Sequence, residues 1–466
     1  MSERYAKIVC TIGPAVDSPE GIRELLEAGM DVARLNFSHG THEEHARRAA
    51  WIRAASREAG KPLAILQDLC GPKIRTGRRG PARVETGAQV RVIAGEEGTD
   101  DVLAVGYEHL TRDLERGDRI LLGDGEVELH VEEVESGGLV CRVENGGPLR
   151  ARMGANLPSG RVRLGTITAQ DRKDLVFGLD LEVDYVALSF VRSAEDVAEL
   201  HALCERAGRP TPVVAKIETP AAVQGIEDIA EAAEAVMLAR GDLGVELSPE
   251  AVPVVQKRVL QVCHEKQTPV IVATEMLQSM VEAPRPTRAE ASDVANAIFD
   301  GADAVMLSAE TATGRHPARA CAMMARIVSE AEGSPHYGLH PSGPGAATPE
   351  AIARAACELA HRIRARGIVV FTNSGETARL VSKARPDRPV IGFAPDESTL
   401  RRMALLWGVW PQRFETGHDA DELAAGVRDH LKRSSLASPG DRVVMVFGTP
   451  LGETGSTNSI RVETIR

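Results

Sequence analysis

Residues 213–240 read VVAKIETPAAVQGIEDIAEAAEAVMLAR, in which two short apolar runs, 213–218 and 235–240, enclose an amphipathic segment of helical length. Runs of the same kind recur at 7–12, 32–37, 63–68, 184–190, 270–274 and 303–308. Strands that alternate with helices form parallel sheets, and eight strand–helix units build a (β/α)8 TIM barrel. An open doubly wound sheet is the alternative, but no GxGxxG segment follows an early run, so we expect the barrel.

One gap interrupts this rhythm. Roughly 110 residues separate the third run from the fourth, far more than a strand–helix connection needs. Residues 80–150 lack helical periodicity and instead alternate apolar with polar residues between Gly-rich turns, as in ARVETGAQVRVIAG (82–95). This pattern predicts a small β-barrel domain that is inserted into a loop of the large barrel and acts as a lid.

The C-terminal third begins with a segment rich in Gly, Pro and Ser (332–350), which is typical of a linker. Apolar runs at 367–372, 388–394 and 441–448 then alternate with helical stretches and predict a separate α/β domain. The expected organisation is a split catalytic barrel at 1–70 and 162–335, a lid at 71–161 and a C-terminal regulatory domain at 345–466.

Composition excludes several functions. The net charge of −12 and an aromatic content of 3% disfavour binding to nucleic acid or to a membrane surface. Seven scattered cysteines include no CxxC pair, which indicates reduced thiols. The start MSERYAKIVC has no signal-peptide core, and no uncharged apolar run approaches the length of a membrane span. We therefore expect a soluble cytoplasmic protein.

Polar and charged residues collect at the ends of most runs, where a barrel of this type places its site. These residues are Arg34, Asn36, Ser38 and His39; Asp68, Lys73 and Arg75; Lys216 and Glu218; Arg240, Gly241 and Asp242; Thr274 and Glu275; and Ser308 and Glu310. Taken singly, each has a structural explanation as an ion pair, a cap or a strand-end hydroxyl. Their shared position at successive strand ends predicts one common site.

The residue types narrow the chemistry. Carboxylates on adjacent strands, Glu218 and Asp242, are suited to a hard divalent cation such as Mg²⁺ or Mn²⁺. Four cations near that point have the character of phosphate ligands, namely Arg34, Arg75, Arg240 and Lys216. A metal ion beside several cations is what phosphoryl transfer requires. No Ser-His-Asp arrangement and no GxxxxGK[ST] loop competes for the role.

Several longer motifs resemble the pyruvate kinase family. They are AKIVCTIGPA (6–15), DVARLNFSHGTHEEH (31–45), GPKIRTG (71–77), AKIET (215–219), ARGDLGVEL (239–247), VATEMLQSM (272–280), PTRAEASDVANAIFDGADAVMLSAETATG (286–314) and GSTN (455–458). The resemblance runs in order from the first strand to the C-terminal end. It implies transfer of a phosphoryl group from phosphoenolpyruvate to ADP, giving pyruvate and ATP in the last step of glycolysis, by an allosteric homotetramer.

The resemblance also implies roles at the metal and the phosphoryl group. Glu218 and Asp242 would bind the Mg²⁺ that bridges the carboxylate and phosphate of phosphoenolpyruvate. Lys216 would neutralise charge on the moving phosphoryl group, and Arg34 would contact that group. The backbone at Gly241 would meet the substrate carboxylate at a helix start.

Proton delivery and nucleotide binding are implied in the same way. Thr274 would lie beside the methylene carbon that takes up a proton, and Ser308 and Glu310 would belong to the relay that supplies it. The residues expected to face the nucleotide are Arg75, Asn36, His39 and, from the lid, Asp124.

A monovalent-cation site marks a departure from the family. In many members K⁺ is held at the positions of Asn36, Ser38, Asp68 and Leu69, and those members have Thr at the position of Leu69 and Glu at that of Lys73. Leu69 offers no side-chain oxygen, whereas Lys73 brings a positive charge. Our hypothesis is that the Lys73 ammonium fills the pocket and that activity needs no K⁺. The alternative is that Lys73 only forms an ion pair with Asp68.

Other departures concern ligand binding. Glu275 stands where Gln is usual, and Met153 where a nucleotide-contacting Lys is common, which leaves the nucleoside preference open. In the C-terminal domain, the loops from Thr372 to Thr377 and from Gly448 to Asn458 match those that bind a phosphorylated allosteric effector in the family. Glu376 would bring a repelling charge into the first loop.

Two other functions remain as alternatives. The first is a Mg²⁺-dependent lyase or aldolase that acts on pyruvate enolates, against which the lid and the ADP-facing Arg75 argue. The second is a catalytically silent effector-binding protein, which would be expected to lack Lys216, Glu218 or Asp242, and none of these is missing.

Overall fold

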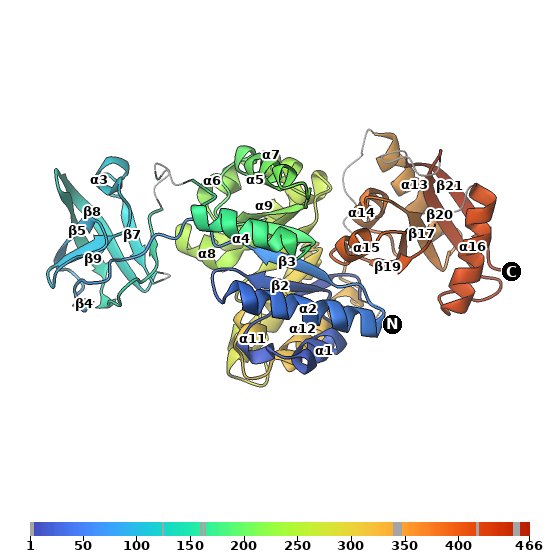
Figure 1. Cartoon of the computed structure of the whole chain (residues 1–466), viewed down its shortest axis with the longest axis horizontal. Coiled ribbons are helices and arrows are strands. Elements are labelled where there is room, and N and C mark those ends of the chain that lie inside the picture. The colour runs from blue at the N-terminus through green and yellow to red at the C-terminus, as the bar shows by residue number, and fades with distance from the viewer. Residues whose placement is uncertain are drawn as a thin grey trace.

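The computed structural model describes residues 4–123, 125–158, 162, 165–338, 347–415, 419–450 and 457–466. Three bodies follow one another along the longest axis of the molecule (Figure 1). The inserted β-domain lies at one end, the barrel in the middle, and the C-terminal α/β domain at the other end.

The central body is a closed barrel of eight parallel strands in the order β1-β16-β15-β14-β13-β12-β3-β2. The strands are β1 (Lys7–Thr11), β2 (Val32–Asn36), β3 (Ala64–Asp68), β12 (Tyr185–Leu188), β13 (Val213–Ile217), β14 (Ala235–Ala239), β15 (Val270–Ala273) and β16 (Ala304–Leu307). Each lies within one of the eight apolar runs of the sequence, so the predicted barrel is confirmed.

Both faces of the barrel strands are buried, which explains why the runs are continuously apolar. On β14, Met237 points into the barrel, whereas Val236 and Leu238 pack against the surrounding helices. On β1, Val9 likewise points into the barrel, and Ile8 packs against the surrounding helices.

The helices around the barrel are α1 (Pro19–Ala28), α2 (His42–Ala59), α4 (Ala169–Asp180), α5 (Ala194–Arg206), α6 (Pro220–Gln224), α7 (Ile226–Ala232), α8 (Arg240–Glu246), α9 (Val252–Glu265), α10 (Arg288–Phe299), α11 (Ala309–Ala312) and α12 (Pro317–Glu332), with 3-10 turns η1 (Pro14–Val16) and η2 (Gln278–Val281). Side chains cap several of them. Thr41 and Glu44 form a reciprocal capping box at the start of α2.

The inserted domain lies between β3 and the barrel helix α4, and its described residues form eight strands and one short helix, α3 (Leu110–Asp113). Its strands are β4 (Arg83–Val84), β5 (Gln89–Ala94), β6 (Val102–Val105), β7 (Arg119–Leu122), β8 (Val127–Glu135), β9 (Gly138–Asn145), β10 (Gly147–Pro148) and β11 (Ala155–Asn156). They form a six-stranded sheet, β11-β7-β8-β9-β5-β6, and a two-stranded sheet, β10-β4.

The predicted small barrel is therefore not closed by continuous ladders. Single bridges at Arg75, to Gly154, and at Thr76, to Val105, connect the two edges of the larger sheet. Residues 74–77 fill this seam: the Ala155 N–H donates to the Ile74 carbonyl at 3.0 Å and the Gly77 N–H donates to the Ala104 carbonyl at 2.9 Å, so hydrogen bonds join both edges of the rolled sheet.

The C-terminal domain has a five-stranded sheet in the order β19-β18-β17-β20-β21. Its elements are α13 (Thr348–Arg362), β17 (Gly367–Phe371), α14 (Glu376–Lys383), β18 (Val390–Ala394), α15 (Glu397–Met403), β19 (Val409–Arg413), α16 (Ala420–Arg433), β20 (Arg442–Gly448) and β21 (Thr457–Thr464). The three predicted runs correspond to β17, β18 and β20. The antiparallel β21 and the edge strand β19 complete the sheet.

Buried ion pairs join this domain to the barrel. The Asp303 carboxylate, just before β16, lies 3.0 Å from both Lys383 Nζ and Arg385 Nη2, and all three side chains are at most 1% exposed. Nearby, Lys7 Nζ donates to the Val409 carbonyl at 2.7 Å. The interface therefore depends on charged groups that have no access to solvent.

Within the described ranges, no helix combines the length and the apolar character that crossing a bilayer requires. All seven cysteines are free thiols.

Candidate active site

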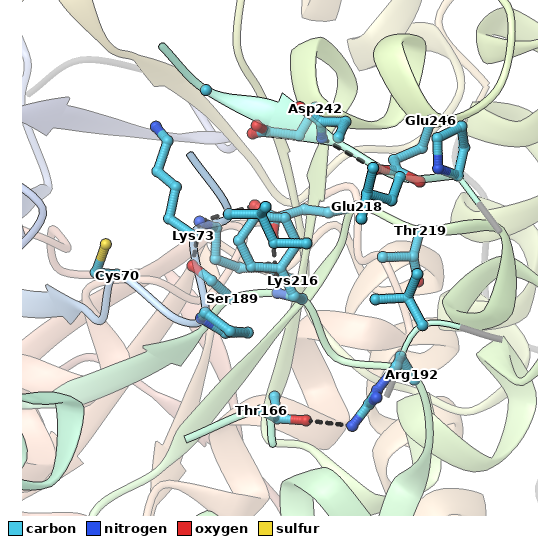
Figure 2. Close-up of a pocket in the computed structure, with 18 of the residues that line it drawn as sticks. Cys70, Lys73, Thr166, Ser189, Arg192, Lys216, Glu218, Thr219, Asp242 and Glu246 are labelled. Atoms are coloured by element: carbon cyan, nitrogen blue, oxygen red, sulfur yellow. Dashed lines mark hydrogen bonds and ion pairs between the residues drawn. The ribbon is translucent and has the colours of Figure 1, made fainter. Parts of the chain in front are cut away.

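A pocket of about 490 Å³ opens at the carboxyl ends of the barrel strands, beside the two chain segments that lead to the lid (Figure 2). It is lined by Arg34, Lys216, Glu218 and Asp242, and by Asn156 of the segment that leads back from the inserted domain. Strands far apart in the sequence thus bring the predicted cations and carboxylates into one cavity.

Asp68, at the end of β3, holds two of these cations. Its carboxylate accepts a hydrogen bond from Arg34 Nε at 2.7 Å and lies 3.3 Å from Lys216 Nζ. Burial alone would raise the pKa of Asp68, but Lys216 and Arg34 more than offset this and hold the pKa below its usual range. Asp68 is therefore an anion that fixes both cations at the pocket wall.

Lys216 contacts three side chains of the site, including Asp68. Its ammonium donates to Ser189 Oγ at 2.7 Å and lies 2.8 Å from Glu218 Oε1. Burial opposes the charge, but Asp68 and Glu218 raise the pKa of Lys216 above its usual value. The side chain therefore remains an ammonium within a nearly solvent-free wall.

Glu218 and Asp242 are the two carboxylates of the pocket. Glu218 is 1% exposed and accepts a hydrogen bond from the Phe190 backbone N–H at 2.8 Å. Burial raises the pKa of Glu218, the nearby Asp242 charge raises it further, and Lys216 opposes the shift. A divalent cation between the two carboxylates would relieve their repulsion.

The donor set suits Mg²⁺, which takes one or two carboxylates and completes its shell with water and substrate oxygens. Among the residues that the structure describes, no cluster of three or more acidic, His or Cys side chains could hold a metal ion. A metal ion at Glu218 and Asp242 would therefore depend on oxygens from the substrate.

The loop after β15 approaches the start of α8. The Gly241 backbone N–H donates to Thr274 Oγ1 at 2.6 Å. Thr274 and Glu275 both have left-handed backbone angles, with φ of 68° and 55°. This strained turn fixes the Thr274 hydroxyl beside Gly241.

Glu310, just after β16, is fully buried and accepts backbone hydrogen bonds from Ser308 at 2.7 Å and from Leu277 at 3.0 Å. It thereby joins the loops that follow β15 and β16. The Ser308 hydroxyl is buried and has no hydrogen-bond partner within the described part of the chain. Thr274, Ser308 and Glu310 lie outside the set of residues that line the pocket.

Comparisons with known proteins identify the family. A model of the barrel domain of pyruvate kinase matches residues 3–321, and a model of its alpha/beta domain matches residues 350–463.

The chain belongs to the pyruvate kinase family.

Relatives and a solved structure agree with this. The chain is 45% identical to a pyruvate kinase of Corynebacterium efficiens, over 99% of this chain and 98% of the relative. It is 43% identical to a pyruvate kinase of Mycobacterium tuberculosis, over 99% and 98%. The crystal structure of a pyruvate kinase from Cryptosporidium parvum superposes with a TM-score of 0.93, at 33% identity and covering 100% of this chain and 97% of that one. As a member of this family, the chain is a phosphotransferase of the kinase type.

Several expected ligand residues of a pyruvate kinase lie elsewhere than in the pocket or are already paired. The Arg240 guanidinium forms a two-pronged ion pair with Asp293 at 2.7 and 2.8 Å. Arg75 donates to the Arg152 carbonyl of the inserted domain. Asn36 and His39 do line the pocket. Asp124 lies outside the described residues.

The monovalent-cation region departs from expectation. Lys73 lines the pocket but is exposed, and no described carboxylate lies within ion-pair distance of it. Figure 2 shows its side chain extending away from the Lys216 ammonium. The ion pair of Lys73 with Asp68, which was the alternative to its role in the cation pocket, is therefore not formed in this structure, where Arg34 and Lys216 contact the Asp68 carboxylate instead.

Four further pocket residues were not predicted. Ser189 and the Thr166–Arg192 pair follow or precede strand β12, and Glu246 ends α8. Ser189 ends an apolar run and so carries the same signal as Thr274. The others lie in polar stretches, where the sequence does not distinguish a pocket residue from a surface residue.

Proposed function

We propose that the pocket transfers the phosphoryl group of phosphoenolpyruvate to ADP, with Mg²⁺ or Mn²⁺ held by Glu218 and Asp242. The observation that carries the proposal is the placement of the Lys216 ammonium, 2.8 Å from Glu218 Oε1 and 3.3 Å from Asp68 Oδ1, in a pocket that Asp242 also lines. Family membership supports the same reaction.

Arg34 and Lys216 act on the phosphoryl group through charge. Asp68 anchors both side chains, so their positive groups are already oriented and need no reorganisation when negative charge moves from one phosphate oxygen to another. A divalent cation held by Glu218 and Asp242 would supply further positive charge near the transferred group. We assign the Gly241 backbone to the substrate carboxylate, and its N–H donates to Thr274 Oγ1 at 2.6 Å, so the Thr274 hydroxyl lies beside it.

Enolate protonation belongs to the loops after β15 and β16. We assign the proton-delivering hydroxyl to Thr274, and the relay behind it to Ser308 and Glu310. Ser308 Oγ has its hydrogen-bonding capacity free within the described structure, as a group that exchanges protons with water would need. Glu310 holds the two loops together through their backbone N–H groups.

Nucleotide binding is assigned to Arg75, Asn36 and His39, with Asp124 of the lid closing over the site. Met153 cannot take the place of a phosphate-binding lysine, because it is 7% exposed and packs in the lid core. The nucleotide phosphates therefore depend on the remaining cations of the pocket.

We assign the role of the monovalent cation to the Lys73 ammonium. Leu69 supplies no side-chain oxygen, and its carbonyl already accepts a hydrogen bond from Ser189 Oγ at 2.8 Å. Lys73 is a cation on the pocket wall without a bound carboxylate in the described structure. We propose that it supplies the positive charge when substrate is bound, and that K⁺ is not required.

Location, assembly and regulation complete the proposal. We place the enzyme in the cytoplasm, where its seven free thiols would persist, and expect a homotetramer as in the family. A phosphorylated effector would bind the loop from Thr372 to Thr377. Arg379 holds the Glu376 carboxylate at 2.6 Å, which reduces the repulsion that Glu376 would exert on a phosphate. The second loop, from Gly448 to Asn458, lies partly outside the described residues.

The test is formation of pyruvate from phosphoenolpyruvate and ADP with Mg²⁺. We expect a rate that requires all three and is abolished by a chelator. Carbon–carbon cleavage of a pyruvate adduct without ADP would favour the lyase instead, and inactivity with every metal and candidate effector would favour a silent binding protein.

A further inference from the structure

The two segments that lead to the lid form one hydrogen-bonded unit. The Ala155 backbone N–H donates to the Ile74 carbonyl at 3.0 Å, and the Thr76 backbone N–H donates to Met153 at 2.8 Å. The second segment also continues the lid sheet, because β11 pairs with β7 through Asn156 and Leu121. These hinge segments, 72–76 and 153–158, are thus built into the lid.

One side chain of this hinge reaches the barrel. Asn156 Nδ2 donates a hydrogen bond to Glu246 Oε1 at 3.0 Å, and both residues line the catalytic pocket. Glu246 is the last residue of α8, and Asp242 lies one turn earlier on the same helix. Figure 2 shows Glu246 and Asp242 on the same wall of the pocket.

Helix α8 is attached at both ends. Near its start, Gly241 donates to Thr274, and at its end Glu246 accepts from Asn156. A helix of seven residues is too short to bend appreciably, so a displacement of Glu246 is transmitted to Asp242. Burial raises the pKa of Glu246, and the bond from Asn156 partly offsets this, as expected for a carboxyl that faces the hinge rather than the solvent.

We propose that the Asn156–Glu246 hydrogen bond couples the position of the lid to the metal-binding carboxylate Asp242. Glu246 is then a positioning residue that acts on Asp242 through α8. This inference rests on the proposed function, in which the lid closes over the nucleotide and Asp242 binds the divalent cation. The hydrogen bond would then connect lid closure directly to the metal site.

The test compares Glu246→Ala, Asn156→Ala, the double variant and Glu246→Gln in the full-length protein. The glutamine variant keeps a carbonyl oxygen that accepts from Asn156 but removes the charge. Glu250→Ala, an exposed residue just beyond α8, is the matched control. Hydrogen–deuterium exchange of the hinge segments is followed without ligands, and the KM for ADP is measured separately from kcat.

We expect both alanine variants to speed exchange at 72–76 and 153–158. They should also raise the KM for ADP by about three- to tenfold, the effect of one lost hydrogen bond, with a smaller change in kcat. The double variant should be no worse than either single variant, and Glu246→Gln should resemble wild type.

Three results would overturn the coupling: unchanged hinge exchange in both alanine variants, additive effects in the double variant, or a Glu246→Gln variant as impaired as Glu246→Ala. The last would mean that the charge of Glu246 matters rather than the bond. If Asn156→Ala unfolds, Asn156→Leu retains the volume and serves in its place. Hydrogen–deuterium exchange of the hinge is measured without substrate, so it tests the coupling alone. The rate of pyruvate formation by wild type is measured separately and tests the proposed reaction.

Discussion

The Lys216 ammonium and the Glu218 carboxylate form an ion pair of 2.8 Å because alternate residues at the end of one strand share a face. A divalent cation at Glu218 must therefore share that carboxylate with an ammonium that is already bound to it. On the proposed function, this ion pair would hold the Lys216 ammonium beside both the metal ion and the phosphoryl group.

Removal of the Lys216 charge should slow the reaction without unfolding the barrel. Lys216→Met should lower kcat by about 10²–10³-fold, the usual effect of losing one oriented electrostatic contact to the transition state. Steady-state assays of pyruvate formation check this, with circular dichroism as the control for folding. A variant with near wild-type turnover would remove Lys216 from the mechanism.

The two pocket carboxylates should both be needed for the metal. Glu218→Gln and Asp242→Asn should each weaken Mn²⁺ binding by more than about tenfold, measured by electron paramagnetic resonance of the free ion. The control is Glu227→Gln, an exposed carboxylate on α7. Mn²⁺ binding unchanged in both pocket variants would place the metal elsewhere.

The assignment of Lys73 predicts a specific response to salt. The wild-type rate should be equal in tetramethylammonium and K⁺ buffers. The double variant Leu69→Thr/Lys73→Glu, which adds a side-chain oxygen and replaces the ammonium with a carboxylate, should become about tenfold faster in K⁺ than in tetramethylammonium. A wild type that is active only in K⁺ would reduce Lys73 to a surface charge.

The domain interface predicts a large loss of stability. Asp303→Asn leaves Lys383 and Arg385 buried without their anion, which should cost about 3–5 kcal/mol of unfolding free energy. Asp421→Asn is the control, because its side chain is 89% exposed and its pairing with Arg461 contributes little. Comparable denaturation midpoints for the two variants would contradict this account of the interface.

Stability should also depend on pH through Lys7. Burial lowers the pKa of Lys7 to about 8, whereas an unfolded lysine has a pKa of about 10.4. Between these values the unfolded chain binds the proton that the folded protein has released, so unfolding free energy rises with pH. The Tm of wild type should therefore gain on that of Lys7→Met from pH 8 to pH 10. Parallel Tm profiles would show that Lys7 is charged in the folded state at pH 10.

The barrel was predictable because its strands are buried on both faces and carry a continuous apolar signal. β19 was missed for the opposite reason: Val409–Arg413 is mostly half-exposed, contains Pro411 and lies at an edge of its sheet. The composition of this segment does not indicate a strand, and its pairing with β18 depends on the tertiary fold.

Within the site, Lys216 and Glu218 were identifiable because a charged side chain in a buried apolar run costs free energy unless it is paired or bound to a ligand. The partners of each charge were not identifiable. The sequence predicts Arg240 as a phosphate ligand, but in the folded barrel its guanidinium lies 2.7 Å from the Asp293 carboxylate. Lys73 and Asp68 are close in sequence, yet Asp68 is satisfied by Arg34 from the neighbouring strand β2 and by Lys216 from β13, two strands away on the other side. Which ions pair depends on distances that only the assembled barrel defines.

The insertion of the lid between two neighbouring strands has a consequence for how the chain assembles. β3 ends at Asp68 and its partner β12 begins only at Tyr185, after the whole lid has been made. A nascent chain that has just completed the lid therefore carries three barrel strands with β3 as an open edge, because the partner of that edge has not been synthesised. Pre-formation of the lid brings its two connecting segments together, so it shortens the loop that must close before β12 can dock. Synthesis thus favours an order in which the lid folds before the barrel closes.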